Sequence, residues 1–280
     1  MQIMRSIGDK RPTFLSDPVW RKVPYEEQPQ EEFDEFLNIL SLIPDILSQG
    51  HSLKKMRDRD LYIASLPIID QICVLVAKSR DFYEHFGTKI AGPLYWPVLP
   101  ATENPTDDPE RGKLFPITLH FPNLNVARIV VMYWTAMAML CSLLSKMCNR
   151  LRFIQVDREL EGGSISKQLD WWVKDSLASS SDEGAFDQSR KVKVDFTEFL
   201  TLDHEADSIS LTRHVCQSVD YFMQEDLLSM GPALAVAPLL CIYGILENEP
   251  SSHPHLQWIM GELSHIRSRG LGFLTQFVQN

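Results

Sequence analysis

The chain has 280 residues, of which 44 % are hydrophobic, and its formal net charge at pH 7 is −10. This composition is typical of a globular protein and supplies enough apolar side chains for a sizeable core. Proteins that bind double-stranded DNA carry clustered Lys and Arg because DNA is a polyanion, so the acidic balance argues against direct binding of nucleic acid.

Five cysteines are spread thinly along the chain, and none of them forms a C-x-x-C motif. Such a set predicts reduced thiols in an intracellular protein. Cys141 and Cys148 share one helical face, but two ligands do not complete a zinc site, so we predict that both are core thiols. The first residues contain no apolar signal core, which favours the nucleus or the cytoplasm.

Residues 1–29 are polar and contain four prolines, which predicts an irregular amino-terminal arm. Within this arm we expect Phe14, Val19 and Trp20 to dock on the body of the protein. A helical domain is expected to occupy residues 30–280.

Two helical regions open that domain. Apolar side chains in residues 31–47 recur at helical spacing, which predicts an amphipathic helix that Pro44 kinks or ends early. Residues 53–80 carry a rougher apolar stripe that Pro67 interrupts, so we expect two helices or one bent helix. Residues 81–86 are expected to continue as a short helix that Gly87 stops.

Residues 92–122 form a different kind of segment, rich in proline and in large aromatic side chains. Its seven prolines rule out regular helix over most of its length, which predicts a loop packed on the body. Residues 117–121 alternate in polarity and could form a short strand. No other stretch is an obvious partner for this strand, so no sheet is expected.

Residues 123–151 are predicted to form a buried central helix, which either Asn123 or Asn125 caps. Residues 129–144 carry no charge. At about 1.5 Å per residue this run extends roughly 24 Å, which is shorter than a membrane core of about 30 Å. We therefore expect the central helix of a soluble protein, with no membrane partner.

The rest of the chain is predicted to be helical apart from residues 157–205, which are polar and are expected to form a flexible, disordered insertion. Apolar spacing predicts helices over residues 207–226, 233–246 and 255–269, and the second of these is apolar enough to be buried. The fold class expected is all-α, a single irregular multi-helix domain around the central helix.

No pattern in the sequence predicts catalytic, cofactor-binding or metal-binding residues. The glycine-rich phosphate-binding motifs and the nucleophile elbow of hydrolases are absent from the sequence. The acidic run at residues 107–111 is interpreted as a solvated turn, and the one at 203–207 as the cap of the following helix. His120 and His214 are interpreted as ordinary packing positions.

Three aromatic residues, Trp96, Tyr133 and Trp134, are the candidates for a pocket that holds a ligand or a partner. The alternative is that Tyr133 and Trp134 belong to the core and that Trp96 plugs a loop.

A series of short stretches, taken in order, resembles one known family. They are LSDPVW at 15–20, IPDIL at 43–47, GPLYWP at 92–97, LHFPN at 119–123, VCQSVDY at 215–221 and RSRG at 267–270. This series is similar to the carboxy-terminal regulatory region of fungal binuclear zinc-cluster transcription factors. The six-cysteine zinc cluster that reads DNA in that family has no counterpart among the five cysteines here.

The resemblance implies a nuclear, non-enzymatic regulatory module without its own DNA-binding domain. Such a module would act in transcriptional regulation through protein partners, either the transcription machinery or a family member, and the family suggests a specialised-metabolism pathway. Two alternatives stay open: a helical module that binds a small-molecule effector in the region of Trp96 and Trp134, and an all-α biosynthetic enzyme whose site has no recognised motif.

Overall fold

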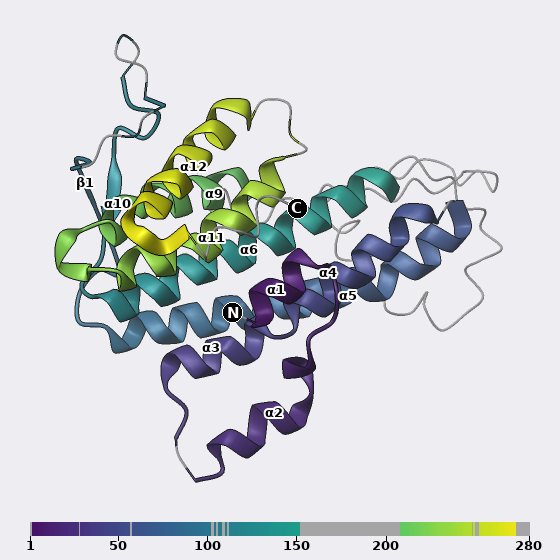
Figure 1. The fold of residues 1–280 in the computed structure, drawn as a ribbon. Helices are drawn as coiled ribbons and strands as arrows, with labels where there is room; N and C mark the ends of the chain where they lie inside the picture. Colours follow the sequence, from purple (N-terminus) through teal and green to yellow (C-terminus); the bar gives the residue numbers. More distant parts are fainter. Residues whose placement is uncertain are drawn as a thin grey trace, which may run out of the picture.

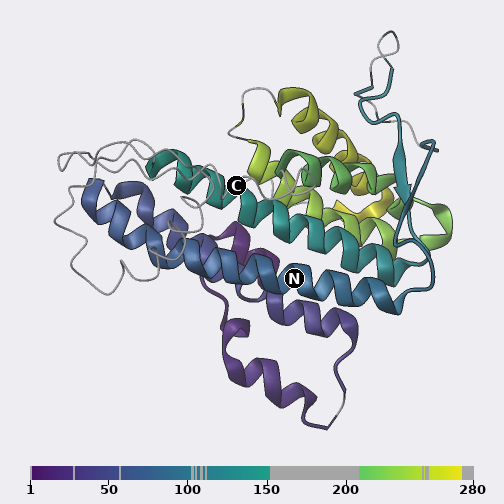
Figure 2. The same cartoon turned by 180° about the vertical axis from the view of Figure 1, so that it is seen from behind.

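In the computed structural model, the residues described are 2–27, 29–56, 58–101, 104, 106–107, 110, 112–151, 208–247, 249 and 252–272. They form a body of packed helices with a single two-stranded sheet at one end (Figures 1 and 2). The predicted all-α fold class is confirmed. The predicted insertion at 157–205 lies outside the described residues.

Helix α6 (Leu124–Leu151) runs through the middle of the body, between α5 on one side and α9 and α11 on the other (Figure 1). Asn123 caps it, because its side-chain Oδ1 accepts a hydrogen bond of 3.0 Å from the backbone N–H of Val126. Most of its side chains are buried, so the prediction of a buried central helix is confirmed.

Among the described residues, two helices are long and apolar enough to cross a membrane by length and composition, Asp60–Lys89 and Leu124–Leu151. In the most apolar window of α6, 83 % of the residues are buried inside the protein. Packing within the protein therefore accounts for the apolar composition of α6, because a helix that is apolar on nearly all sides needs neighbours on all sides.

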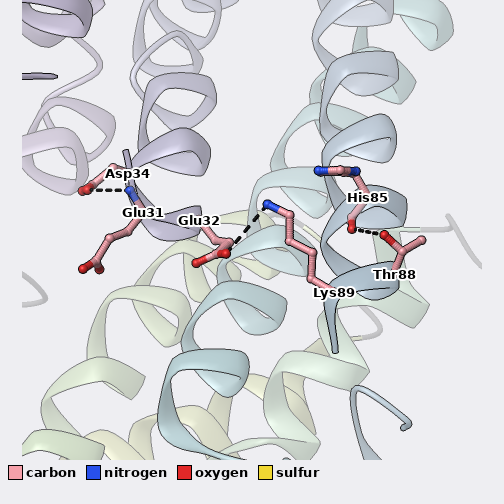
Figure 3. A network of polar contacts seen from close by, with 6 residues as sticks. All are labelled: Glu31, Glu32, Asp34, His85, Thr88 and Lys89. Atoms are coloured by element: carbon pink, nitrogen blue, oxygen red, sulfur yellow. Dashed lines mark hydrogen bonds and ion pairs between the residues drawn. The ribbon is translucent and has the colours of Figure 1, made fainter. Parts of the chain in front are cut away.

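Helices α3 (Glu32–Leu40) and α4 (Ile43–Ser52) take the place of the amphipathic helix predicted for residues 31–47. Pro44 lies in the first turn of α4, where its missing N–H costs nothing, so the predicted early break is confirmed. Figure 3 shows the start of α3, where Glu32 forms an ion pair of 3.7 Å with Lys89 at the end of α5. A 3₁₀ turn, η3 (Leu53–Lys55), leads from α4 towards α5.

Helix α5 (Asp58–Lys89) is one continuous helix, with Pro67 inside it and residues 81–86 included. The helix predicted for residues 81–86 is present as the end of α5, but the expected stop at Gly87 is wrong because α5 runs on to Lys89. Proline removes one hydrogen bond from the helix interior. The buried face continues on both sides of Pro67, through Leu61, Ile68 and Ile72, so tertiary packing offsets that loss.

The amino-terminal residues are more regular than predicted. They form α1 (Gln2–Gly8), the 3₁₀ turn η1 (Phe14–Ser16), α2 (Pro18–Lys22) and the 3₁₀ turn η2 (Val23–Tyr25). Proline at the first position of a helix is pre-set for helical φ. Asp17 caps α2 by accepting a hydrogen bond of 2.9 Å from the N–H of Val19. The prediction of an irregular arm is thus wrong for these stretches.

The proline-rich segment contains a sheet that was not expected. Strand β1 (Trp96–Val98) pairs antiparallel with β2 (Thr118–His120), and Trp96 lies opposite His120. The pairing places the two ends of the segment side by side. Sequence periodicity did not identify β1, because a strand of three residues with a central proline carries no alternating pattern.

The carboxy-terminal helices, residues 208–271, pack on the opposite side of α6 from α5 (Figure 2). It consists of α9 (Ser208–Gln217), α10 (Val219–Phe222), the turn η6 (Glu225–Leu227), α11 (Met230–Leu246), α12 (His253–Ile266) and η8 (Arg267–Leu271). Leu239 and Ile242 on α11 are fully buried, which confirms the second buried helix.

Candidate functional site

The three aromatic residues predicted to line one pocket lie in different places. Tyr133 stacks on Tyr83 of α5, with ring centroids 4.1 Å apart. Trp134 instead lies against Tyr95 and His214, at centroid distances of 5.1 and 5.0 Å. Successive residues of a helix point about 100° apart, so Tyr133 and Trp134 face different neighbours.

The burial of these rings agrees with the core alternative. Tyr133 is 9 % exposed and Trp134 is 4 % exposed, whereas Trp96 is 39 % exposed on β1. The three side chains therefore do not line a shared pocket. Tyr133 and Trp134 stabilise the packing of α6 against the elements on either side.

The described residues line a small, partly open cavity elsewhere, where α9, α10 and α12 meet residues between β1 and β2. Its volume is about 20 Å³, which is room for about one water molecule. Ten residues line it: Pro100, Asn104, Asp107, Lys113, Phe115, Thr118, Cys216, Asp220, Trp258 and Glu262.

Glu262 and Asn104 form the closest polar contact at this cavity. The side-chain amide of Asn104 donates a hydrogen bond of 2.6 Å to Oε1 of Glu262 and one of 3.1 Å to the carbonyl oxygen of Trp258. Its Oδ1 accepts hydrogen bonds from the N–H and the hydroxyl of Thr106, at 2.9 and 2.6 Å. Asn104 thus joins the β1–β2 segment to α12.

Two further carboxylates hold the same segment. Asp107 accepts hydrogen bonds of 3.2 Å from the N–H groups of Asn104 and Leu114. Asp220 on α10 accepts one of 3.2 Å from the N–H of Ala101. Asp107, which the sequence placed in a solvated turn, is half-buried and organises the turn through its backbone bonds.

Glu262 is only 4 % exposed, and burial raises its pKa to about 7. The negative charges of Asp220 and Asp107 raise the pKa further, while the Asn104 hydrogen bond and the positive charge of Arg269 lower it. Burial also raises the pKa of the Cys216 thiol on the cavity wall. A buried thiol of high pKa is a poor nucleophile, so proton binding by Glu262 is the chemistry that the cavity supports.

Within the described part of the chain, no group of three or more His, Cys, Asp or Glu side chains could hold a metal ion. None of the five cysteines forms a disulfide, and Cys141 and Cys148 are buried as predicted for core thiols. His120 contacts Gln224 and His214 lies against Trp134, which agrees with their interpretation as packing positions.

Sequence reasoning missed Glu262 and Asn104. Apolar spacing in the helix predicted at 255–269 places five residues on its inner face: Leu256, Ile259, Met260, Leu263 and Ile266. Glu262 lies three residues after Ile259 and four before Ile266, so helical spacing does place it beside the buried face. Met260, by contrast, is exposed, which corrects that prediction.

A second candidate site lies on residues 13–25, which we call the arm loop. Four of its large hydrophobic side chains are more than half exposed, whereas Leu15 is half-buried: Phe14 55 %, Val19 59 %, Trp20 53 % and Val23 55 %. Phe14 and Trp20 contact each other edge-to-face at 5.5 Å. The prediction that Phe14, Val19 and Trp20 dock on the body is wrong, and Figure 1 shows α2 projecting away from it.

Both ends of the arm loop are anchored to the body. The N–H of Thr13 donates a hydrogen bond of 3.2 Å to Asp45 on α4. At the other end Tyr25 lies near Asp34 on α3, and burial together with that carboxylate raises the pKa of the Tyr25 phenol. Between these anchors, α2 packs on the neighbouring turns η1 and η2. The apolar side chains are therefore held together in a defined structure on the surface.

The fold and these two sites define an all-helical protein with an anchored aromatic surface and a buried, proton-binding carboxyl group. No family model, curated protein or solved structure was found to match this chain.

Proposed function

We propose that this chain is a regulatory module that acts in transcriptional control by binding a protein partner through the arm loop. The observation that carries the proposal is the set of four exposed hydrophobic side chains held together at residues 14–23. The resemblance to the regulatory region of zinc-cluster transcription factors supports the transcriptional role. The acidic net charge agrees with partners other than DNA.

The exposed side chains have the properties of an interaction surface. Trp and other aromatic residues carry much of the energy of protein interfaces when a partner buries them. The anchors at Thr13 and Tyr25 hold the loop in place before binding, which lowers the entropic cost of association. Single exposed hydrophobic residues are common on protein surfaces, but four within ten residues form a patch.

The charges beside the patch indicate the chemistry of the partner. Arg21 and Lys22 occupy the last turn of α2, next to Trp20 and Val23. A groove with an apolar floor and carboxylates along its rim would complement both features. A lipid surface fits less well, because α2 has five residues and the chain as a whole is acidic.

Site-specific photo-crosslinking in the source cells tests the proposal. A photoreactive residue at Val23 is expected to capture one dominant protein of the transcription apparatus, whereas the same residue at Val74, exposed on α5, is not. Adding Trp20→Ser should remove the adduct and change transcript levels, with a melting temperature within about 2 °C of wild type.

Three outcomes would overturn the proposal. They are equal capture at positions 23 and 74, capture of a second copy of this chain alone, and unchanged transcript levels in the Trp20→Ser variant. Binding of the purified chain to anionic vesicles that is lost with Trp20→Ser would assign the arm loop to a membrane surface instead.

A further inference from the structure

A second feature of the molecule is independent of the arm loop and of the function proposed for it. The segment between β1 and β2 is held to the carboxy-terminal helices by side chains far apart in sequence. Asn104 and Glu262 are 158 positions apart, and their hydrogen bond measures 2.6 Å. Asn104 is itself buried, and each polar atom of its side chain has a partner within the described residues.

The backbone is shaped to allow this contact. A Cβ atom on Gly261 would lie 2.8 Å from Oδ1 of Asn104, closer than real Cβ contacts allow. Glycine at 261 therefore lets the Asn104 side chain lie flat against α12. Phe115 lies at the same cavity as Asn104, and its ring centroid is 4.8 Å from that of Trp258 in an edge-to-face arrangement.

Charged groups from several elements surround Glu262. Asp107 and Lys113 belong to the β1–β2 segment, Asp220 to α10 and Arg269 to η8, while Cys216 of α9 lines the same cavity. Two of these groups are carboxylates that repel a negative charge on Glu262. Ionising Glu262 in place would therefore add a third negative charge to a site with room for about one water molecule.

We propose that Asn104 and Glu262 form a proton-controlled clamp that holds Asn104 and the adjoining Asp107 beside α12 while Glu262 is neutral and loosens when Glu262 loses its proton. In the neutral state the 2.6 Å hydrogen bond needs only a lone pair on Oε1, which the protonated carboxyl group keeps. In the ionised state Glu262 gains by turning into water, away from Asp107 and Asp220, and Asn104 loses its acceptor.

The pH range follows from the proton balance. The pKa of Glu262 is about 7 in the closed clamp, against 4.5 for a solvated glutamate. The closed state therefore binds more protons, so the clamp is fully held below about pH 4.5 and weakens up to about pH 7. Above that range its stability is level, because Glu262 is ionised in both states.

Reaction of Cys216 reports opening, because this thiol is buried in the wall of the cavity. We would measure its rate of modification by 4,4′-dithiodipyridine, residue by residue, in wild type and in Glu262→Gln from about pH 5 to pH 8. The glutamine keeps an acceptor for Asn104 but cannot ionise. The wild-type rate is divided by the Glu262→Gln rate at each pH, because thiol ionisation changes both rates with pH in the same way.

The wild-type rate relative to that of Glu262→Gln should rise about tenfold per pH unit up to about pH 7 and then level off. Glu247→Gln, at an exposed glutamate after α11, is the matched control and should keep the wild-type profile. Cys241, which is buried on α11, should not follow this profile. Asn104→Ala should expose Cys216 at every pH.

Several results would overturn the clamp. They are a rate ratio that does not change with pH, a Glu247→Gln variant that behaves like Glu262→Gln, and a Cys241 rate that rises in parallel with that of Cys216. A Glu262→Gln variant that melts below wild type at about pH 8 would also overturn it, because a neutral side chain should hold the clamp better there.

Discussion

Tyr133 and Trp134 are adjacent in sequence, yet each belongs to a different aromatic cluster. Tyr133 lies on the α5 side of α6, against Tyr83, and Trp134 lies on the α9 side, against Tyr95 and His214. Both rings are buried, so each contributes packing rather than a binding surface. Aromatic composition alone does not separate a pocket from a core, because burial decides the role of each ring.

Replacing Trp134 by alanine should lower the free energy of unfolding by about 3–5 kcal/mol, because it opens a cavity beside α6. Trp96→Ala is the matched control and should cost less than about 1 kcal/mol, since its side chain is partly exposed on β1. Urea denaturation measures both values. Equal losses for the two variants would contradict the burial of Trp134.

At the scale of elements, α11 shows how a local sequence is constrained by a neighbouring turn. Gly231 lies in its first turn, where a Cβ atom would be 2.2 Å from the carbonyl oxygen of Phe222 and 2.8 Å from the side chain of Leu227. Gly244 lies later in the same helix, and a Cβ atom there would have open space within 4 Å. A methyl group would therefore clash with neighbouring atoms at position 231 but not at position 244.

Gly231→Ala should destabilise the protein by about 1–3 kcal/mol, because the backbone of α10 or the start of α11 must shift. Gly244→Ala should instead stabilise it by up to about 1 kcal/mol, since alanine loses less backbone entropy in a helix. Thermal unfolding of both variants measures the difference. A stabilising Gly231→Ala would show that α10 and α11 are not packed this closely.

For the whole molecule, stability should depend on pH through Glu262. Its folded-state pKa of about 7 exceeds the 4.5 of a solvated glutamate, so its contribution is full below about pH 4.5 and is lost as pH rises to about 7. The difference amounts to about 3 kcal/mol if the group stays in place on ionisation. Burying Glu262 therefore lowers the free energy of unfolding by an amount that depends on pH.

The difference in free energy of unfolding between wild type and Glu262→Gln should change between about pH 4.5 and pH 7. The difference in free energy of unfolding, variant minus wild type, should increase from about pH 5 to pH 7 and then remain level. Urea denaturation at four or five pH values, with Glu247→Gln as control, measures it. A difference that is constant with pH would show that Glu262 titrates normally in the folded protein.

The sequence alone determined the central helix and the all-α class, and it limited the cap of that helix to Asn123 or Asn125. Each of these depends on residues within a few positions of one another: the uncharged run of α6, the Asn123 cap and the break at Pro44. Helical hydrogen bonds and caps are local, so a local pattern is sufficient to predict them.

Only the tertiary structure decided where the surfaces and the buried acid lie. The arm loop was expected against the body, but its anchors at Asp45 and Asp34 hold it out from the body. The Asn104–Glu262 contact joins positions 158 residues apart. Burial and long-range hydrogen bonds depend on which elements pack together, and a local pattern in a single sequence does not predict that packing.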